Sequence, residues 1–286
     1  VKFIVRFKHK HPIKLMCKII KLCRSTYYKY KKNTKSKRTI ENTMISNAIL
    51  NIYNESKGRY GAPKIHKKLA DYNIIISFKR VQRLMNKLNI KSIITRKYKP
   101  YSSKNKAPNL VNIIDRDFET AGINQKWVTD ITYIYTKKDS WCYLASVMDL
   151  YTRKIIGYAI SRSIDTRLAI DAIKDAVYKQ KPSNQLILHS DLGSQYTSTE
   201  FGDYIKRHNI KHSFSRKGNP YDNAPIESFH ASFKKEEVNV SKYTDFKSAK
   251  LVIFEYIESW YNRKRIHSSI GYITPQLRED QARKSA

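Results

Sequence analysis

Three acidic side chains occupy positions that an alternating strand and helix pattern would bring together. Asp130 lies inside a run of β-branched and aromatic residues, Asp191 directly follows a short apolar run, and Glu227 lies in the first turn of an expected helix. A charged residue inside a strand needs a chemical reason, and open α/β sheets carry their sites at strand ends. Three unpaired carboxylates in one cleft would repel each other and take up protons. Divalent cations relieve that repulsion.

This set of oxygen donors predicts metal-dependent phosphoryl transfer. Mg²⁺ prefers carboxylate oxygens together with water and substrate phosphate. Two ions about 3.5–4 Å apart activate an attacking oxygen and stabilise the leaving one, while the protein supplies position and charge without a covalent intermediate. We therefore expect two Mg²⁺ ions, for which Mn²⁺ can substitute, held by three catalytic residues: Asp130, Asp191 and Glu227.

The charge balance predicts a polyanionic partner. The 286 residues include 56 Lys or Arg against 24 Asp or Glu, a formal net charge of +32. Such an excess repels itself in a compact chain unless a polyanion is nearby. A bias of an AT-rich genome toward Lys is the alternative explanation, but it does not account for the scarcity of acids. No apolar run reaches the length of about 18 residues that spans a bilayer. We expect double-stranded DNA as the partner, no membrane, and a cytoplasmic, nucleoid-associated protein.

The cysteines predict reduced thiols. Cys17, Cys23 and Cys142 form an odd, sparse set, which is typical of a cytoplasmic protein. His9 and His11 lie near the first two, but their spacing does not suit a zinc site. We expect buried thiols in a small helical unit instead.

The second half of the chain predicts an α/β fold with one mixed sheet of five strands and flanking helices. Its catalytic unit is expected over 118–281, with a C-terminal helix over 246–261, and a tail is expected at 282–286. Asp130 belongs to its first strand, Asp191 follows its fourth strand, and Glu227 begins a later helix. The elements are expected, in chain order, as strands 127–135, 141–150 and 155–161, helix 166–178, strand 186–188, helix 200–208, strand 210–214, a helix from about 223, and a helix over 246–261.

The first half predicts helices and DNA contacts. Residues 1–37 form a basic arm in which Ser25 would cap the second helix of a helix-turn-helix remnant. A helix-turn-helix domain is expected over 38–92, with helices at 41–56 and 62–72 and a third capped by Ser77, and a basic linker over 93–117. The third helix has an apolar stripe and donors elsewhere, which suits a major groove. A plain three-helix bundle is the alternative. The predicted DNA contacts on this helix are Lys79, Arg80, Arg83 and Lys87.

Several motifs resemble one known family. Trp127–Thr132, His189–Asp191 and Asn223–Phe229, with 35 residues between Asp191 and Glu227, resemble the DDE transposases of bacterial insertion sequences, which are related to retroviral integrases. The group most similar in pattern is the OrfB-type catalytic protein that ribosomal frameshifting joins to a small upstream frame. The resemblance covers nearly the whole chain and includes three further segments: Tyr60–His66, Met148–Gly157 and Trp260–Tyr272.

The resemblance implies an RNase H-like integrase core with Asp130, Asp191 and Glu227 as metal ligands, and Lys234 in contact with DNA near the scissile phosphate. Helical geometry separately places Lys234 on the face of Glu227; a solvated lysine is the alternative. The implied activity is a polynucleotidyl transfer that cleaves and joins strands, through a copied-out circle. The implied partners are terminal inverted repeats and target DNA, a homodimer or higher assembly, and an upstream-frame protein or fusion.

Other polar residues are weaker candidates. Gln195 and Tyr196 follow Asp191 and are expected near the DNA end. Asp149 is interpreted as a turn or strand-edge residue, Asp222 or Asn223 as the cap of the helix that carries Glu227, and Glu236 is a lesser candidate. The remaining candidates for DNA contact are Arg216 and Lys217 in a basic loop, for which an ordinary connection is the equal alternative, and Arg265 and His267 at a helix end, for which a structural role is the equal alternative.

Rival enzyme classes lack their residues in this sequence. No histidine is followed three residues later by Arg, as the pattern of tyrosine recombinases requires, and no phosphate-binding Gly-x-x-x-x-Gly-Lys loop is present. A zinc deaminase would need His-x-Glu with Cys-x-x-Cys, which are also absent. Two alternatives remain: an RNase H-fold endonuclease without joining activity, and a DNA-binding repressor with a decayed catalytic domain, against which the intact acids argue.

Overall fold

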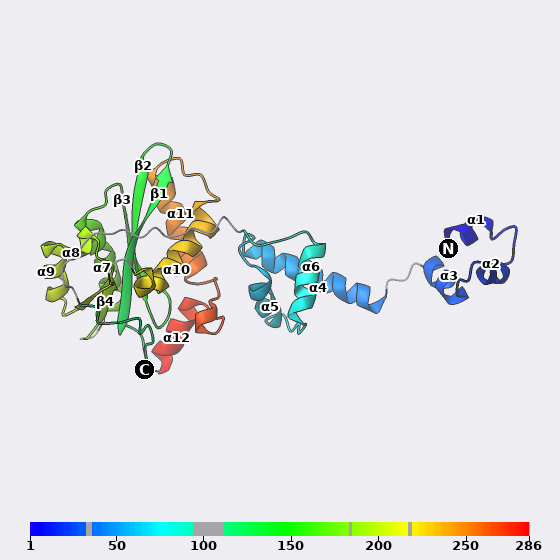
Figure 1. Cartoon of the computed structure of the whole chain (residues 1–286), viewed down its shortest axis with the longest axis horizontal. Helices are drawn as coiled ribbons and strands as arrows, with labels where there is room; N and C mark the ends of the chain where they lie inside the picture. The colour runs from blue at the N-terminus through cyan, green and yellow to red at the C-terminus, as the bar shows by residue number, and fades with distance from the viewer. Residues whose placement is uncertain (33–35, 94–110, 183–184, 217–218, 286) are drawn as a thin grey trace. The chain divides into compact units, whose positions relative to one another are not determined.

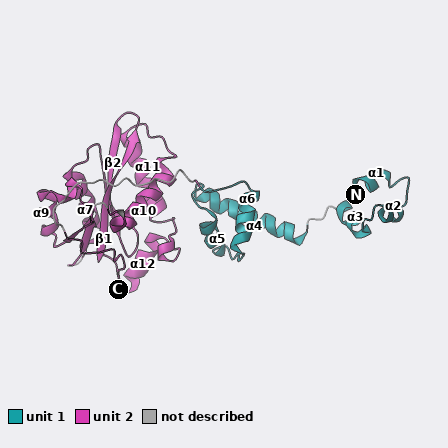
Figure 2. Cartoon of the chain, in the orientation of Figure 1, with its two compact units in different colours: residues 1–92 teal, residues 93–286 magenta. Residues whose placement is uncertain are grey.

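The computed structural model describes residues 1–32, 36–93, 111–182, 185–216 and 219–285. The chain divides into two compact units, Val1–Ser92 and Ile93–Ala286, shown in Figure 2. Each unit has its own buried core, so each is described by itself. No helix in the described parts of the chain is long and apolar enough to cross a membrane.

Three short helices open the first unit: α1 (Lys2–Phe7), α2 (Ile13–Ile19) and α3 (Arg24–Lys31). Their small core consists of Ile4, Met16, Cys17 and Tyr27. The expectation of buried thiols in this helical unit is confirmed for Cys17 but is wrong for the exposed Cys23. Ser25 lies inside α3, whose N-cap is Cys23, so the predicted Ser25 cap is also wrong.

Three longer helices complete the first unit: α4 (Lys37–Glu55), α5 (Ala62–Ala70) and α6 (Phe78–Lys87) (Figure 1). The Ser77 hydroxyl accepts a hydrogen bond from the Arg80 backbone N–H at 3.3 Å, which confirms the predicted cap of α6. Helix α4 begins four residues before the predicted start because Ser36 caps it. The apolar stripes of the three helices meet in a buried core that includes Ile49, Ile65, Leu69 and Val81.

The second unit is built on a mixed sheet of five strands, as predicted: β1 (Lys126–Thr136), β2 (Ser140–Asp149), β3 (Ile155–Ser161), β4 (Ile187–Ser190) and β5 (Lys211–Phe214). Their order in the sheet is β3-β2-β1-β4-β5. The first three strands form an antiparallel meander, and β4 and β5 run parallel to β1. This arrangement sets the end of β4 beside the middle of β1 (Figure 1).

Helices cover both faces of this sheet. Helices α7 (Thr166–Gln180), α8 (Ser194–Thr197) and α9 (Thr199–Arg207) contribute to one core with Trp127, Ala145 and Val147 of the strands. Successive strand residues point to opposite faces, so Asp130 and Ser146 point away from that core. The helix on their side is α10 (Ala224–Phe233), which follows η1 (Pro220–Asn223) and continues into the π-helical η2 (Lys234–Val238).

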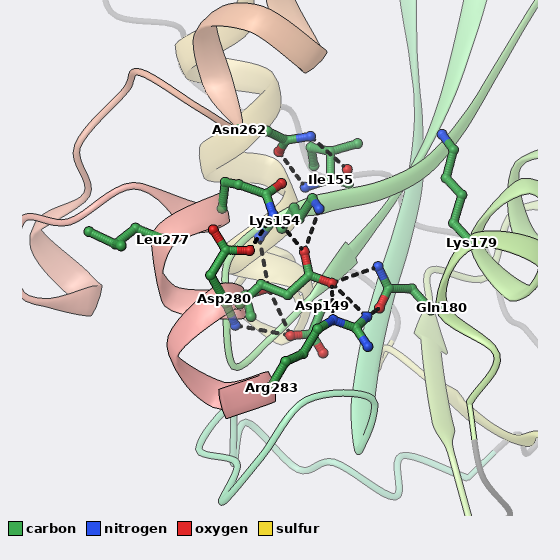
Figure 3. Close-up of polar contacts among 12 residues, drawn as sticks. Asp149, Lys154, Ile155, Lys179, Gln180, Asn262, Leu277, Asp280 and Arg283 are labelled. Carbon is green, nitrogen blue, oxygen red and sulfur yellow. Dashed lines mark hydrogen bonds and ion pairs between the residues drawn. The ribbon is translucent and has the colours of Figure 1, made fainter. Parts of the chain in front are cut away.

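The C-terminal part adds α11 (Phe246–Phe254), the π-helical η3 (Glu255–Tyr261), η4 (Ser268–Ile270) and α12 (Pro275–Ser285). Helix α12 enters the segment expected as a tail from residue 282. Its Glu279 pairs with Lys154 and accepts a hydrogen bond from the Gln180 amide at 3.1 Å, and Arg283 donates to Gln180 at 2.8 Å (Figure 3). Polar contacts therefore fasten this helix to the residue directly before β3 and to the last residue of α7.

Candidate active site

Asp130 is fixed on β1 by contacts with α10. A hydrogen bond of 3.2 Å joins Asp130 Oδ2 to His230 Nδ1, and a second of 3.3 Å joins His230 Nε2 to the Ser146 hydroxyl. An ionised carboxylate only accepts, so Nδ1 donates to Asp130. Next to it, the Asn223 amide donates to the Thr129 carbonyl at 3.3 Å. The start of α10 is thus tied to the strand at the carboxylate.

Asp191 directly follows β4, beside Asp130. The parallel register pairs Val128 with His189, and two further residues along each strand lead to Asp130 and Asp191. The Gly193 backbone N–H donates to Asp191 Oδ1 at 3.0 Å and holds the carboxylate in its turn. Desolvation by the surrounding protein and the negative charge of Asp130 raise the pKa of Asp191 to about 6.

Glu227 lies in the first turn of α10 and is the third member of the group. Desolvation raises the pKa of this carboxyl, and the charges of Asp130 and Asp191 raise it further. Each carboxylate therefore lies within electrostatic reach of the others, although their side chains belong to β1, the β4 end and α10. Among the residues that the structure describes, no three His, Cys, Asp or Glu side chains form a ready metal-binding cluster. The carboxylate oxygens of these three residues are the donors that a hard cation prefers. The positive charge of a bound cation would also remove their mutual repulsion.

Lys234 begins η2, directly after α10, on the same side of the molecule as Asp130. Its ammonium lies 4.1 Å from the centre of the Tyr133 ring. Desolvation lowers the pKa of Lys234, and the negative charge of Asp130 opposes that change. Lys234 therefore places a half-buried positive charge beside the three carboxylates.

Asp222 has a different role from the predicted one. Its fully buried carboxylate accepts hydrogen bonds from Arg116 Nε at 2.7 Å, Arg216 Nε at 2.9 Å and the Asn112 amide at 3.1 Å. Burial opposes its ionisation, but the two guanidinium groups outweigh burial and hold the pKa of Asp222 well below its usual range. Of the two residues predicted to cap α10, Asn223 holds the N-cap position, without a side-chain hydrogen bond, and Asp222 does not. Arg216 is engaged in this cluster, and Lys217 lies outside the described residues.

Arg265 is also committed inside the protein. The side chain is buried, and its guanidinium donates to Glu236 at 3.0 Å and to the Ser232 hydroxyl at 3.1 Å. Glu236 in turn accepts from Tyr256 and Trp260, each at 3.0 Å. Of the two roles predicted for Arg265, the structure supports the structural one.

The two candidates that follow Asp191 differ in how deeply their side chains are buried. Gln195 is half-buried in α8, next to Gly193. Tyr196 is buried, with its hydroxyl 3.1 Å from the Thr129 hydroxyl, so its predicted contact with DNA is wrong. Asp149 ends β2 and accepts from the Thr152 backbone N–H at 2.9 Å, which agrees with its interpretation as a turn or strand-edge residue.

The basic residues of α6 divide into bound and exposed ones. Arg80 joins two helices, donating to Glu41 at 2.9 Å and to Asn42 at 2.7 Å. Lys79 and Arg83 are exposed and line a hollow, together with polar Gln82 and Asn86 of α6 and with the start of α5. Lys87 is exposed in the last turn of α6. The exposed members of this set are free to meet a ligand, whereas Arg80 stabilises the bundle.

His230 is a site residue that the sequence analysis missed. It lies three residues after Glu227, so both belong to one side of α10. That spacing was the available signal, but the contact with Asp130 bridges 100 residues of chain. Helical periodicity alone could not reveal it.

Comparisons with known proteins agree with this architecture. Two models described as "Integrase core domain" match residues 121–220 and 208–275, and a model described as "HTH-like domain" matches residues 40–98. The transposase for insertion sequence element IS904 of Lactococcus lactis subsp. lactis (strain IL1403) is 38% identical over 242 residues, covering 84% of this chain and 95% of the relative.

The transposase InsF for insertion sequence IS3A of Escherichia coli (strain K12) is 34% identical over 281 residues, covering 97% of each chain. Among solved structures, the trimeric form of the HTLV-2 integrase catalytic core domain in complex with magnesium superposes with a TM-score of 0.41 at 15% identity. That match covers 56% of this chain and 99% of the other.

Proposed function

Because this chain belongs to the insertion-sequence transposases of the DDE integrase superfamily, we propose that Asp130, Asp191 and Glu227 are its catalytic, metal-binding carboxylates. The chain is a DNA transposase with an HTH-like DNA-binding domain. The observation that carries the proposal is the convergence of three carboxylates from β1, the end of β4 and the first turn of α10, where desolvation and the charges of Asp130 and Asp191 raise the pKa of Glu227. Bound cations would offset the repulsion among these three negative charges.

The proposed ligands are oxygen donors from three elements, which suits two Mg²⁺ ions or Mn²⁺. When bound, such ions supply positive charge to the attacking and leaving oxygens of an in-line displacement. His230 donates to Asp130 and fixes its orientation, and the Gly193 N–H does the same for Asp191. These contacts position the carboxylates before substrate arrives.

Lys234 completes the proposed site. A half-buried ammonium beside Asp130 can offset charge that develops on a phosphate under attack. Water is the proposed nucleophile for nicking, and a DNA 3′ hydroxyl is the proposed nucleophile for joining. Gln195, in the helix after Asp191, is the proposed contact with the DNA end.

The proposed substrates are the terminal inverted repeats of the element and a target duplex. In the first unit, the exposed side chains of Lys79, Arg83 and Lys87 are the proposed contacts with the repeats. The proposed domains are 1–37, 38–92, the linker 93–117, and the catalytic unit from 118. Acting on two ends requires a dimer or higher assembly, and an upstream-frame protein or fusion remains a proposed partner. A DNA substrate places the proposed site of action at the nucleoid, in the cytoplasm.

The decisive experiment replaces Asp191 by Asn. We expect this variant to lose cleavage and joining while its affinity for the DNA ends is retained, because the change removes one charge and keeps the shape. Asp203→Asn, at an exposed aspartate of α9, is the matched control and should remain active. Retained strand transfer by Asp191→Asn would refute the assignment. Joining assays with pre-cut ends distinguish a transposase from an endonuclease, and DNA binding without any cleavage would indicate a repressor.

A further inference from the structure

The β1–β2 hairpin carries an exposed group of aromatic rings. Tyr133, Tyr135 and Trp141 are 48%, 54% and 49% exposed. The Trp141 ring lies edge-on to both tyrosines, with centroid distances of 5.1 Å to Tyr133 and 5.3 Å to Tyr135. Tyr135 and Trp141 are direct partners across the two strands, and Tyr133 lies on the same face because strand residues alternate. We call these three residues the hairpin aromatic cluster.

One lysine contacts this cluster and two more lie in the turn of the same hairpin. The Lys234 ammonium lies 4.1 Å from the centre of the Tyr133 ring, and Lys137 and Lys138 are exposed in the turn of the hairpin. Aromatic faces combined with cations are the surface that binds unpaired nucleic acid, because bases stack on the rings while cations meet the phosphates. The +32 charge of the chain adds a long-range attraction for such a strand.

The cluster borders the proposed active site along β1. Asp130 points to the opposite face of β1, because strand residues alternate. Lys234 links Asp130 to the cluster, because its ammonium contacts the Tyr133 ring and is also affected by the charge of Asp130. Lys234 belongs to the helical segment that follows Glu227. At about 3.3 Å per strand residue, Tyr133 and Tyr135 lie about 10 Å and about 17 Å along the strand from Asp130. These spans equal about three to five steps of a stacked DNA strand at about 3.4 Å per step.

We propose that the hairpin aromatic cluster binds unpaired bases of the DNA strand within about five nucleotides of the phosphate held at the carboxylates. The position of that phosphate rests on the proposed function; the stacking itself does not. A second copy of this chain is the competing occupant. Two such copies would bring like charges together at a lysine-flanked surface, so the charges favour DNA.

Binding measured in the presence of a chelator tests the proposal, since no strand is then cut. The probes are a labelled duplex with five unpaired nucleotides at one end and a fully paired duplex of the same sequence. Each stacked base contributes about 5- to 100-fold in affinity, so the full-length chain should prefer the unpaired end by at least about 5-fold. The double variant Tyr135→Ala, Trp141→Ala should lose this preference and keep its affinity for the paired duplex.

Two control variants accompany that measurement. Trp141→Phe keeps an aromatic ring and should keep most of the preference. Tyr178→Ala removes a tyrosine on α7 that is 79% exposed, and it should behave like the unchanged chain. The proposal is overturned if the unchanged chain does not prefer the unpaired end, or if the double variant keeps that preference or loses affinity equally for both duplexes.

Fluorescence supplies a second readout. Of the three tryptophans, Trp127 and Trp260 are buried, so quenching by a short single-stranded oligonucleotide reports mainly on Trp141. The unchanged chain should be quenched, and Trp141→Phe should lose the response. If the double variant instead lowers the mass measured by sedimentation, the cluster is a contact between copies and the proposal is wrong. None of these readouts depends on cleavage. An Asp191→Asn variant that still cleaves and joins DNA would therefore refute the catalytic assignment without affecting the proposal for the hairpin aromatic cluster.

Discussion

His230 links two of the segments that carry the proposed catalytic carboxylates. Its ring reaches Asp130 on β1 at 3.2 Å from the helix that contains Glu227. We predict that His230→Phe, which keeps an aromatic ring of similar size, slows single-turnover cleavage by about 10- to 100-fold, the usual effect of losing a residue that orients a metal ligand. DNA affinity should stay unchanged, and His230→Gln should restore part of the rate. An unaffected rate in His230→Phe would show that Asp130 needs no such support.

The buried histidines predict acid sensitivity. Desolvation lowers the pKa of His189 and of His212 to about 4 in each case. In the unfolded chain both histidines would take up protons near pH 6.5, whereas in the folded chain they stay neutral until about pH 4. The free energy of unfolding is therefore undiminished above pH 6.5 and falls as the pH drops from 6.5 toward 4. For His189, which is fully buried between Ser213 and Ser215, the loss amounts to about 3 kcal/mol.

Urea unfolding at pH 7 and at pH 4.5 measures this effect. His189→Gln should be less stable than the unchanged chain at pH 7, because it loses two hydrogen bonds, but its stability should depend less on pH. His208→Gln, at an exposed histidine, is the matched control. Equal pH dependence in His189→Gln and the unchanged chain would contradict a depressed pKa at His189.

At the residue scale, the sequence indicates which side chains can do chemistry but not which of them are already paired with another residue of the protein. Asp130, Asp191 and Glu227 were selected because the expected order of strands and helices would bring together a charge inside a strand, one after a strand and one in the first turn of a helix. Arg80 and Arg265 were selected for charge alone, and each has its carboxylate partner far away in the chain, at Glu41 and Glu236. Only the folded chain brings such partners together, so these ion pairs could not be predicted from the sequence.

At the element scale, hydrophobic periodicity predicted most of the second unit. Strand β3 was predicted with the bounds it has, and the other strands and α7 to within about two residues at each end. Helix α12 was missed because its sequence is mostly polar and its attachment depends on Glu279, whose partners lie on other elements. A helix attached by polar contacts has no apolar stripe for a periodicity argument to find.

Strand β3 and helix α7 approach so closely that a single methyl group should separate them. A Cβ added to Gly157 would lie 2.5 Å from the Ala172 carbonyl oxygen and 2.5 Å from the Ala176 backbone nitrogen. Backbone atoms inside a helix cannot rotate away. We predict that Gly157→Ala lowers the free energy of unfolding by at least about 1–3 kcal/mol, the usual effect of overpacking a core.

Gly202→Ala is the matched control for that substitution. Gly202 lies inside α9, and an added Cβ would meet nothing within 4 Å. Alanine should stabilise this helix by about 0.5–1 kcal/mol. Thermal unfolding of the two variants should therefore shift in opposite directions. A Gly157→Ala protein as stable as the unchanged chain would mean that β3 and α7 have room to separate.

At the scale of the whole molecule, the two compact units divide the proposed work. The first unit contributes exposed cations on α6, and the second contributes the carboxylates and Lys234. The chain as a whole is strongly positive, so any DNA contact releases counterions and loses affinity as salt rises. The number of phosphates contacted is then measurable as the slope of log affinity against log salt concentration.

That slope tests which cations of α6 meet DNA. Each phosphate contact contributes about −0.9 to the slope, so replacing Lys79 and Arg83 together by Ala should make it shallower by about 2. Arg80→Ala is the informative comparison, because its guanidinium is held by Glu41 and Asn42. It should lower the free energy of unfolding and leave the slope nearly unchanged. If Arg80→Ala reduces the slope as much as a change at Lys79 or Arg83 does, the Glu41 contact must open on DNA binding, and the division between structural and DNA-binding cations on α6 is wrong.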